Sequence, residues 1–373
     1  MYPRILEKNI NEKFHTGKAI IVLGARQVGK TTLIKKILQE KDYLFLNGDD
    51  PTVRALLSEI NTEEIKSLIG NYKYVFVDEA QRIHNIGLTL KIIVDNFSNV
   101  QLLITGSSSF YLGDEINETL TGRKWEYILY PIAWEEYEQK LGYLKAYQQL
   151  ENRLLYGFYP DVLNNPGQEK EILKNLVDSY LFKDVLALSG LRRASVLEKL
   201  VQALALQIGQ EVNYTELGTM LGINKNTVQR YIDILERNFI VFTLPSFNKN
   251  LRNEIKRNRK IYFYDLGIRN AVIGNFAPLD LRQDKGAMWE NFLIAERKKQ
   301  HAYKQTFTQM FFWRTTQQQE IDLVEVQANK ISGYEFKWKP KNIHIPRTFS
   351  KTYNANVKII TTKNFRDFVI VKI

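Results

Sequence analysis

Residues 24–31 fill every fixed place of the pattern G-x-x-x-x-G-K-[ST], and they read Gly24-Ala25-Arg26-Gln27-Val28-Gly29-Lys30-Thr31, with Thr32 next. Glycines let the backbone curl so that its N–H groups point at a phosphate, and the following helix adds its positive end. Lys30 would reach the β- and γ-phosphates, and the Thr31 hydroxyl would bind Mg²⁺. The alternative is a chance octapeptide. The apolar run before it and the amphipathic stretch 33–38 after it favour ATP binding.

Two carboxylates follow a second apolar run, in Tyr74-Val75-Phe76-Val77-Asp78-Glu79. Asp78 is predicted to hold Mg²⁺, and Glu79, one residue further out, to polarise the attacking water. Such a strand end is common by itself. Its place about 45 residues after the phosphate loop is what makes it typical of a nucleotide hydrolase.

Hydroxyls close a third apolar run, Leu102-Leu103-Ile104-Thr105-Gly106-Ser107. Ligands of open α/β sheets bind at the carboxyl ends of the strands, so Thr105 or Ser107 is predicted to sense the γ-phosphate or orient water. An ordinary serine-rich turn is the alternative. Arg123 is a candidate arginine finger offered to a neighbouring subunit of a homo-oligomer, and an ordinary surface arginine is the equal alternative.

A second set of chemical residues lies near the C-terminus. Asp322 and the pair Glu335 and Lys337 fall in successive apolar runs, and Glu290 stands upstream in a helical stretch, 288–299. These residues resemble the PD-(D/E)xK nuclease fold, in which the three acids converge on one Mg²⁺ and Lys337 positions or deprotonates water. A surface set of salt bridges is the alternative, and domains of this fold also serve as binding modules only.

Residues 215–231 resemble a helix-turn-helix. Gly218 lies where two helices would touch, Gly222 supplies the turn and Asn224 caps the second helix. That helix would expose side chains suited to phosphates and base edges of DNA, namely Lys225, Asn226, Gln229 and Arg230. The segment 249–260, with six basic residues and one acid, follows where a wing would lie. A winged-helix spacer or protein contact is the alternative.

These motifs must be positioned by an α/β framework. In the first third, apolar runs alternate with helical stretches such as 51–69 and 86–97, which predicts a parallel sheet covered on both faces. Helical segments rich in Leu, Tyr and Lys occupy 133–206, and strand-like runs return after residue 260. We therefore expect three domains at 1–135, 136–270 and 271–373.

Charge separates these regions. Residues 1–140 hold 17 Lys/Arg and 19 Asp/Glu, whereas residues 281–373 hold 17 and 8, of a total net charge of +11 over 373 residues. The basic C-terminal part predicts a nucleic-acid partner, with a solvated basic face as the alternative. The chain has no cysteine and no apolar stretch near the roughly 18 residues of a membrane span, so we expect no membrane association and a cytoplasmic location.

Together the motifs resemble the AAA-superfamily ATPases, specifically a prokaryotic group of predicted ATP-binding proteins with a C-terminal domain of unknown function. The resemblance covers nearly the whole chain and rests on residues 24–32, Val77-Asp78-Glu79-Ala80, Ile104-Thr105-Gly106-Ser107-Ser108, Leu120-Thr121-Gly122-Arg123 with Pro131, Tyr262-Phe263-Tyr264-Asp265-Leu266-Gly267 and Trp289-Glu290-Asn291-Phe292. It implies a P-loop ATPase core with bound ATP and Mg²⁺, followed by winged-helix and restriction-endonuclease-like parts. Arg192 and Arg193 are the candidates for a lid arginine.

Three functions follow from these patterns. The first is a Mg²⁺-dependent ATPase whose nucleotide cycle controls a DNA-associated C-terminal half. The second is a metal-dependent nuclease regulated by the ATPase, and the third is a non-cleaving ATP-dependent switch that binds DNA or protein. A P-loop kinase is disfavoured because Glu79 beside Asp78 suits water activation.

Overall fold

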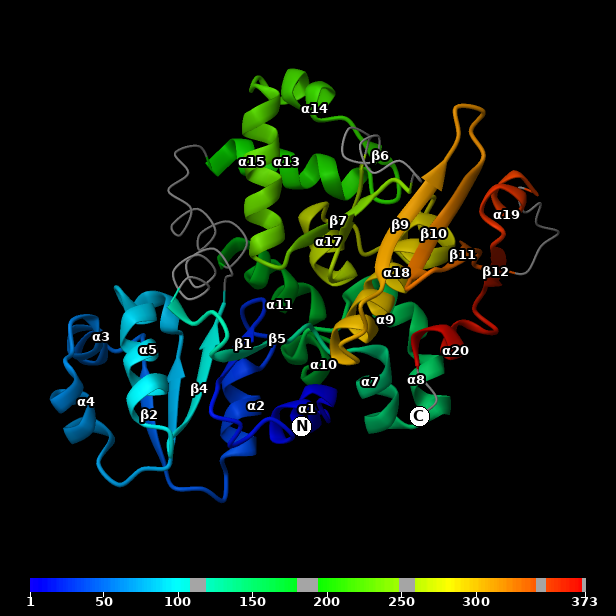
Figure 1. Ribbon diagram of the computed structural model, residues 1–373. Coiled ribbons are helices and arrows are strands. Elements are labelled where there is room, and N and C mark those ends of the chain that lie inside the picture. The colour runs from blue at the N-terminus through cyan, green and yellow to red at the C-terminus, as the bar shows by residue number, and fades with distance from the viewer. Residues whose placement is uncertain (108–118, 180–193, 248–258, 340–346, 371–373) are drawn as a thin grey trace. The chain divides into compact units, whose positions relative to one another are not determined.

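The computed structural model describes residues 1–107, 119–179, 194–247, 259–339 and 347–370 (Figure 1). The chain divides into two compact units, Met1–Pro131 with Arg237–Phe239, and Ile132–Glu236 with Ile240–Ile373. The predicted boundary at 135/136 lies close to the first division. The predicted boundary at 270/271 falls inside helix α17 (Leu266–Val272), where the structure has no break between units.

The first unit is built on a five-stranded parallel sheet in the order β2-β3-β4-β1-β5. Its strands are β1 Ala19–Leu23, β2 Tyr43–Asn47, β3 Tyr74–Asp78, β4 Gln101–Gly106 and β5 Lys124–Ile128. All residues of β1 and β4 are buried, as the continuous apolar runs predicted for a sheet covered on both faces. The carboxyl ends of β1, β3 and β4 therefore meet at one edge.

Helices of this unit are α1 Ile5–Asn11, α2 Lys30–Ile37, α3 Pro51–Ser58, α4 Thr62–Ile69, the 3₁₀ turn η1 Ala80–Arg82 and α5 Ile86–Asn96. The helical stretch predicted over 51–69 consists of two helices, α3 and α4. Asn61 starts the second one: its side chain accepts from the Glu64 N–H at 3.0 Å, while the Glu64 carboxylate accepts from the Asn61 N–H at 3.0 Å. This capping box favours a new helix start over a continuous helix.

Five short helices open the second unit: α7 Trp134–Leu141, α8 Tyr143–Gln148, α9 Leu150–Tyr156, α10 Pro160–Asn164 and α11 Glu169–Leu176. Gly157 ends α9 at φ +68°, and a Cβ there would lie 2.0 Å from an oxygen of Asp265. That buried carboxylate accepts from the N–H of Phe158 at 2.7 Å and caps α17. The glycine thus gives the carboxylate room beside the turn.

The middle of this unit runs α13 Ala194–Leu206, β6 Glu211–Val212, α14 Tyr214–Leu221, α15 Lys225–Arg237, β7 Val241–Pro245 and β8 Arg259–Phe263. The strands pair antiparallel in the order β6-β8-β7. A Cβ on Gly218 would lie 2.7 Å from the Ile223 carbonyl, and Gly222 is left-handed at φ +65°. The predicted close approach and turn are confirmed.

The C-terminal part runs η3 Leu279–Leu281, α18 Lys285–Tyr303, β9 Gln309–Arg314, β10 Glu320–Gln327, β11 Lys330–Phe336, α19 Arg347–Tyr353, β12 Asn356–Ile360 and α20 Phe365–Val369. The sheet order is β12-β11-β10-β9, with β12 parallel to β11 and the other pairs antiparallel. An aromatic core that includes Trp313 and Phe349 packs on this sheet. Helix α18 packs on β8 of the three-stranded sheet and on β11 of the four-stranded sheet, so its side chains contact both sheets.

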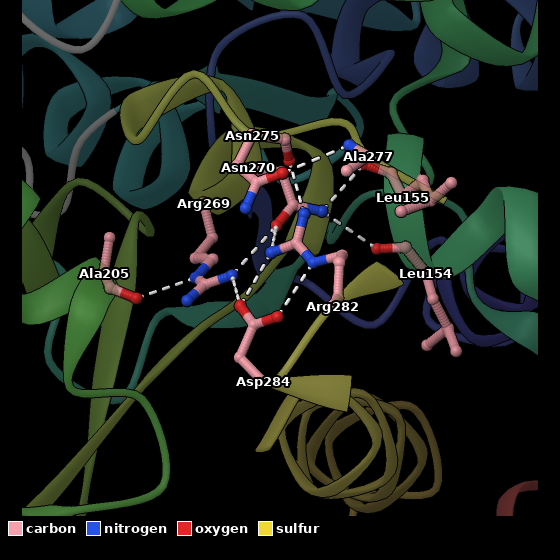
Figure 2. A network of polar contacts seen from close by, with 9 residues as sticks. All are labelled: Leu154, Leu155, Ala205, Arg269, Asn270, Asn275, Ala277, Arg282 and Asp284. Atoms are coloured by element: carbon pink, nitrogen blue, oxygen red, sulfur yellow. Dashed lines mark hydrogen bonds and ion pairs between the residues drawn. The ribbon is translucent and has the colours of Figure 1, made fainter. Parts of the chain in front are cut away.

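A buried polar network holds α17 in the second unit (Figure 2). Asp284 accepts hydrogen bonds from both Arg269 and Arg282. Arg269 also donates to the Ala205 carbonyl at 2.7 Å, and Asn270 donates to the carbonyls of Leu154 and Leu155. Segments far apart in sequence thereby share one network.

Candidate nucleotide-binding site and C-terminal acidic cluster

The phosphate loop joins the end of β1 to the start of α2, as predicted. A Cβ on Gly24 would lie 2.1 Å from the Leu129 carbonyl oxygen, so the backbone of the neighbouring segment excludes any side chain there. Gly29 precedes α2 in the left-handed region, at φ +95°. Glycine alone adopts this conformation freely, and it turns the loop N–H groups toward the helix start, where an anion binds.

Lys30 lies inside this loop with 4% of its surface exposed. Its ammonium donates to the carbonyls of Gly24 at 3.0 Å and Ala25 at 2.9 Å. Burial lowers the pKa of Lys30 to about 8, although the charges of Glu79 and Asp78 oppose the shift. A phosphate next to this ammonium would supply the full negative charge that two carbonyl oxygens do not.

Asp78 and Thr31 meet at the carboxyl edge of the sheet. The Thr31 hydroxyl donates to the Asp78 carboxylate at 3.0 and 2.9 Å, and the Thr105 hydroxyl donates to the same carboxylate. A hydroxyl and a carboxylate are the oxygen ligands that Mg²⁺ prefers. These residues therefore fit Mg²⁺ bound together with the phosphates of ATP.

Glu79 follows Asp78 in a left-handed conformation, at φ +49° and ψ +43°. The side chain of Gln81 donates to the Glu79 carboxylate and also to the Ser107 hydroxyl, at 2.7 Å for the latter. The Thr105 hydroxyl accepts from the Glu79 N–H at 3.3 Å. The structure thus brings together the predicted residues Glu79, Thr105 and Ser107. It adds Gln81, whose only sequence signal is its place two residues after Glu79.

Arg26 and Thr32 lie beside this centre, whereas Arg123 precedes β5 and therefore lies at the opposite, amino edge of the parallel sheet. Arg26 is partly buried within the loop, close enough for its charge to lower the pKa of Lys30. Thr32 is exposed on the first turn of α2. Arg123 forms an ion pair of 2.5 Å with Asp95 of its own unit. An arginine finger would have to leave this partner.

The second helix of the predicted helix-turn-helix corresponds to α15. The Asn224 side chain accepts from the Thr227 N–H at 2.8 Å, which confirms the predicted cap. Its first turns carry the predicted polar side chains on the surface, and these exposed residues are Lys225, Asn226, Gln229 and Arg230. Of the basic segment 249–260, residues 249–258 lie outside the described ranges, as do Ser108, Arg192 and Arg193.

The predicted C-terminal residues also gather at one place. Asp322 on β10 accepts from the Phe336 N–H at 2.7 Å, and Glu335 on β11 pairs with Lys337 at 3.1 Å. Burial and the charges of Glu290 and Glu335 raise the pKa of Asp322 well above its usual value. The antiparallel register of β10 and β11, with Leu323 opposite Tyr334, brings the adjacent residues Asp322 and Glu335 to neighbouring positions, where like charges disfavour ionisation.

This cluster is already compensated by cations. Glu290 accepts from the ammonium of Lys260 at 3.0 Å and from the Tyr262 hydroxyl at 2.6 Å. Lys260 also pairs with Glu320. Over the described ranges, no three His, Asp or Glu side chains are arranged to hold a metal ion. Glu290, Asp322 and Glu335 are therefore not arranged as a group of three metal ligands within the described ranges, and Mg²⁺ binding by fewer of these carboxylates stays a prediction.

Comparison with known protein families identifies three segments. Residues 16–138 match the family described as "AAA domain". The N-terminal unit is an AAA-type P-loop ATPase domain. Residues 147–279 match "Domain of unknown function (DUF8612)", and residues 285–372 match "Domain of unknown function (DUF4143)". The winged-helix and nuclease-like assignments stay predictions.

Similar proteins match most of this chain. An uncharacterized protein of Methanocaldococcus jannaschii is 23% identical over 96% of this chain and 85% of its own length. An uncharacterized protein of Mycobacterium tuberculosis is 25% identical over 88% of this chain and 72% of its own. Among solved structures, the Walker-type ATPase PABY2304 of Pyrococcus abyssi covers 73% of this chain and 96% of that chain, with 17% identity and a TM-score of 0.50. This likeness concerns the fold.

In the ranges that the structure describes, no helix combines the length and apolar character needed to cross a bilayer.

Proposed function

We propose that the AAA domain hydrolyses ATP with Mg²⁺ and that Glu79 activates the water. The contact of Thr31 with Asp78, beside the buried Lys30, carries this proposal. Mg²⁺ would neutralise charge on the β- and γ-phosphates, held by the Thr31 hydroxyl and the Asp78 carboxylate. Lys30 would leave the carbonyls of Gly24 and Ala25 for the phosphates.

Glu79 is the base in this mechanism because it extends beyond Asp78 and is held by Gln81. Its carboxylate accepts the proton of the attacking water while that water's oxygen forms a bond to the γ-phosphorus. The bond from this phosphorus to the bridging oxygen breaks, and the electron pair stays on ADP. Ser107 and Thr105, at the end of β4, orient the water or the γ-phosphate.

Steady-state release of phosphate tests these roles with Lys30→Ala and Glu79→Gln. Glu79→Gln is expected to bind ATP normally and to lose at least about 100-fold in kcat, because the base is gone. Lys30→Ala is expected to lose ATP binding itself. Lys36→Ala is the matched control, since Lys36 is on the same helix and pairs with Glu7 at the surface. Unchanged turnover in both site variants would disprove the mechanism.

We further propose that the helix-turn-helix binds DNA and that the nucleotide state controls this binding. Support comes from the capped helix α15, which exposes Lys225, Asn226, Gln229 and Arg230 on its first two turns. The order of α13, β6, α14, α15, β7 and β8 suits a winged helix. A non-cleaving switch is favoured over a nuclease, because lysines compensate the acidic cluster.

Fluorescence anisotropy of a DNA duplex across a salt series tests this second proposal. Affinity is expected to fall steeply with salt, and Lys225→Ala with Arg230→Ala should reduce the slope of log Kd against log salt by about two. Lys174→Ala, at an exposed position of α11, is the control for a general loss of charge. A slope that is equal in all variants would exclude α15 as the DNA-binding element.

A further inference from the structure

Lys260 lies at the centre of the C-terminal acidic cluster. It belongs to β8, in the sheet that follows the helix-turn-helix, yet its ammonium reaches Glu290 of α18 at 3.0 Å and pairs with Glu320 at the start of β10. Only 1% of the residue is exposed. A lysine so deeply buried needs carboxylate partners to stay charged.

The groups around Lys260 are mostly acidic. Four carboxylates face it or lie beside its partners, and these are Glu290, Glu320, Asp322 and Glu335. The Tyr262 hydroxyl donates to the same Glu290 oxygen that Lys260 contacts. Lys337, beside Glu335, and Arg314, 3.7 Å from Glu320, supply the other positive charges. Lys260 is the one of these cations that is almost fully buried.

We propose that Lys260 is the resident cation of this cluster, so that Glu290 and Asp322 bind a divalent metal ion only when the ammonium is absent. A divalent ion takes carboxylate oxygens at about 2.0–2.6 Å, which would place it where the ammonium contacts Glu290. Two cations at that distance repel each other strongly in a buried site. The inference is independent of the proposed ATPase, whose residues lie in the other unit.

This assignment explains why three acids that match a nuclease pattern are not arranged as metal ligands in the described chain. The pattern considers only residues 290–337, whereas the compensating charge comes from β8, thirty residues earlier than Glu290. Lys260 therefore acts as an autoinhibitory contact on the acidic cluster.

Mn²⁺ binding, followed by electron paramagnetic resonance without nucleotide, tests the proposal. All proteins carry Asp78→Asn, so that the ATPase site contributes no ion. Lys260→Met is expected to bind one Mn²⁺ at least about tenfold more tightly than the parent, because the competing charge is gone. Lys260→Arg keeps a cation and is expected to behave as the parent. Lys285→Met is the control, because Lys285 is on α18, the helix of Glu290, and pairs with the exposed Asp280 of η3.

The added variant Asp322→Asn identifies the site, since it should abolish the Mn²⁺ gained by Lys260→Met. A folded Lys260→Met protein that gains no Mn²⁺ overturns the proposal. Circular dichroism shows whether Lys260→Met folds. If it does not, Mn²⁺ binding to the parent, which retains Lys260, tests the proposal. The parent and its Asp322→Asn variant are then expected to have the same Mn²⁺ isotherm, and an Asp322-dependent ion in the parent overturns the proposal.

Discussion

Lys30 and Lys260 are both almost fully buried, with 4% and 1% exposed, yet their pKa values shift in opposite directions. Burial dominates at Lys30, whose direct partners are two neutral carbonyls, and lowers its pKa to about 8. At Lys260 burial also favours the neutral form, but the charges of Glu290, Glu320 and Asp322 outweigh it and raise the pKa. The first lysine lacks an anion that a ligand can bring, whereas the second already has its anions.

ATP binding should therefore take up a proton at Lys30. Above pH 8 a growing fraction of the free protein holds Lys30 neutral, while bound phosphates would restore its higher pKa. Affinity should fall as pH rises from 8 to 10. Isothermal titration at pH 8.5 in two buffers of different ionisation enthalpy measures the uptake, and Lys30→Arg, which does not titrate there, should show none. Equal uptake in both proteins would contradict the assignment.

Gln81 should position Glu79 without touching ATP. Its removal in Gln81→Ala frees the Glu79 carboxylate and the Ser107 hydroxyl, so kcat for ATP hydrolysis is expected to fall about tenfold with KM nearly unchanged. Gln81→Asn should recover only part, because its shorter amide does not reach both partners. Arg82→Gln, the exposed neighbour that pairs with Asp49, is the control. A change confined to KM would refute a positioning role.

Residue types at fixed spacings predicted the phosphate loop and the cluster of Asp78, Glu79, Thr105 and Ser107. Gln81 and Lys260 were missed for a physical reason. Neither residue belongs to a motif of fixed spacing, and Lys260 contacts residues thirty or more positions away in the sequence. Only the tertiary structure shows which charges meet.

At the scale of elements, continuous apolar runs predicted the strands of the first sheet well. Some features of only a few residues, such as a helix start or a partly exposed strand, were not predicted. The apolar run that precedes Glu79 forms strand β3, Tyr74–Asp78, as predicted. The break at Asn61 was missed because the apolar period continues through it, although its capping box is readable in Asn61 and Glu64. Strand β12 was missed because its residues alternate between exposed and half-buried until Ile360.

Helix α17 should depend on Asp284 in a pH-dependent way. Burial opposes ionisation, but hydrogen bonds from Arg282 and Arg269 outweigh it and hold the pKa of Asp284 at about 2. Asp284→Asn leaves two arginines without their anion and is expected to lower the free energy of unfolding by about 3 kcal/mol at pH 7. Because the folded pKa is depressed, this stabilisation is fully present above the ordinary value of 3.8 and disappears as pH falls through about 2.

Urea unfolding of the parent and Asp284→Asn from pH 7 down to about 1.5, below the folded pKa of Asp284, measures this difference. The exposed Asp280, paired with Lys285 at 3.2 Å, provides the control variant Asp280→Asn, which should leave stability unchanged at every pH. A constant difference between Asp284→Asn and the parent across the series would show that charge is not its origin.

At the scale of the whole molecule, the chain separates an ATPase unit of near-neutral charge from a basic second unit. The first division was predictable, because the alternation of strands and helices stops near Pro131. The division expected at 270/271 rested on the change in the sequence from helical segments to strand-like runs. Arg269 and Asn270, on that boundary, donate to three carbonyls of two earlier helices, α9 and α13, so hydrogen bonds cross the expected division.

Two units should give two thermal transitions, of which nucleotide moves one. Mg²⁺-ADP at a hundred times its Kd is expected to stabilise the Met1–Pro131 unit by about 2.7 kcal/mol and to leave the other transition unchanged. Differential scanning calorimetry measures both, with Lys30→Ala as the variant that should show no shift. A single transition, or two that move equally, would contradict the division into independently stable units.

The left-handed backbone conformation of Glu79 lowers the stability of the fold at a residue proposed to be needed for activity. A glutamate at φ +49° is strained, whereas asparagine tolerates this region far better. Glu79→Asn should therefore leave the fold at least as stable as the parent while removing the carboxylate that we propose activates water. Selection for a high free energy of unfolding alone would replace this glutamate. Its presence in the strained conformation therefore lowers stability in favour of the proposed ATP hydrolysis.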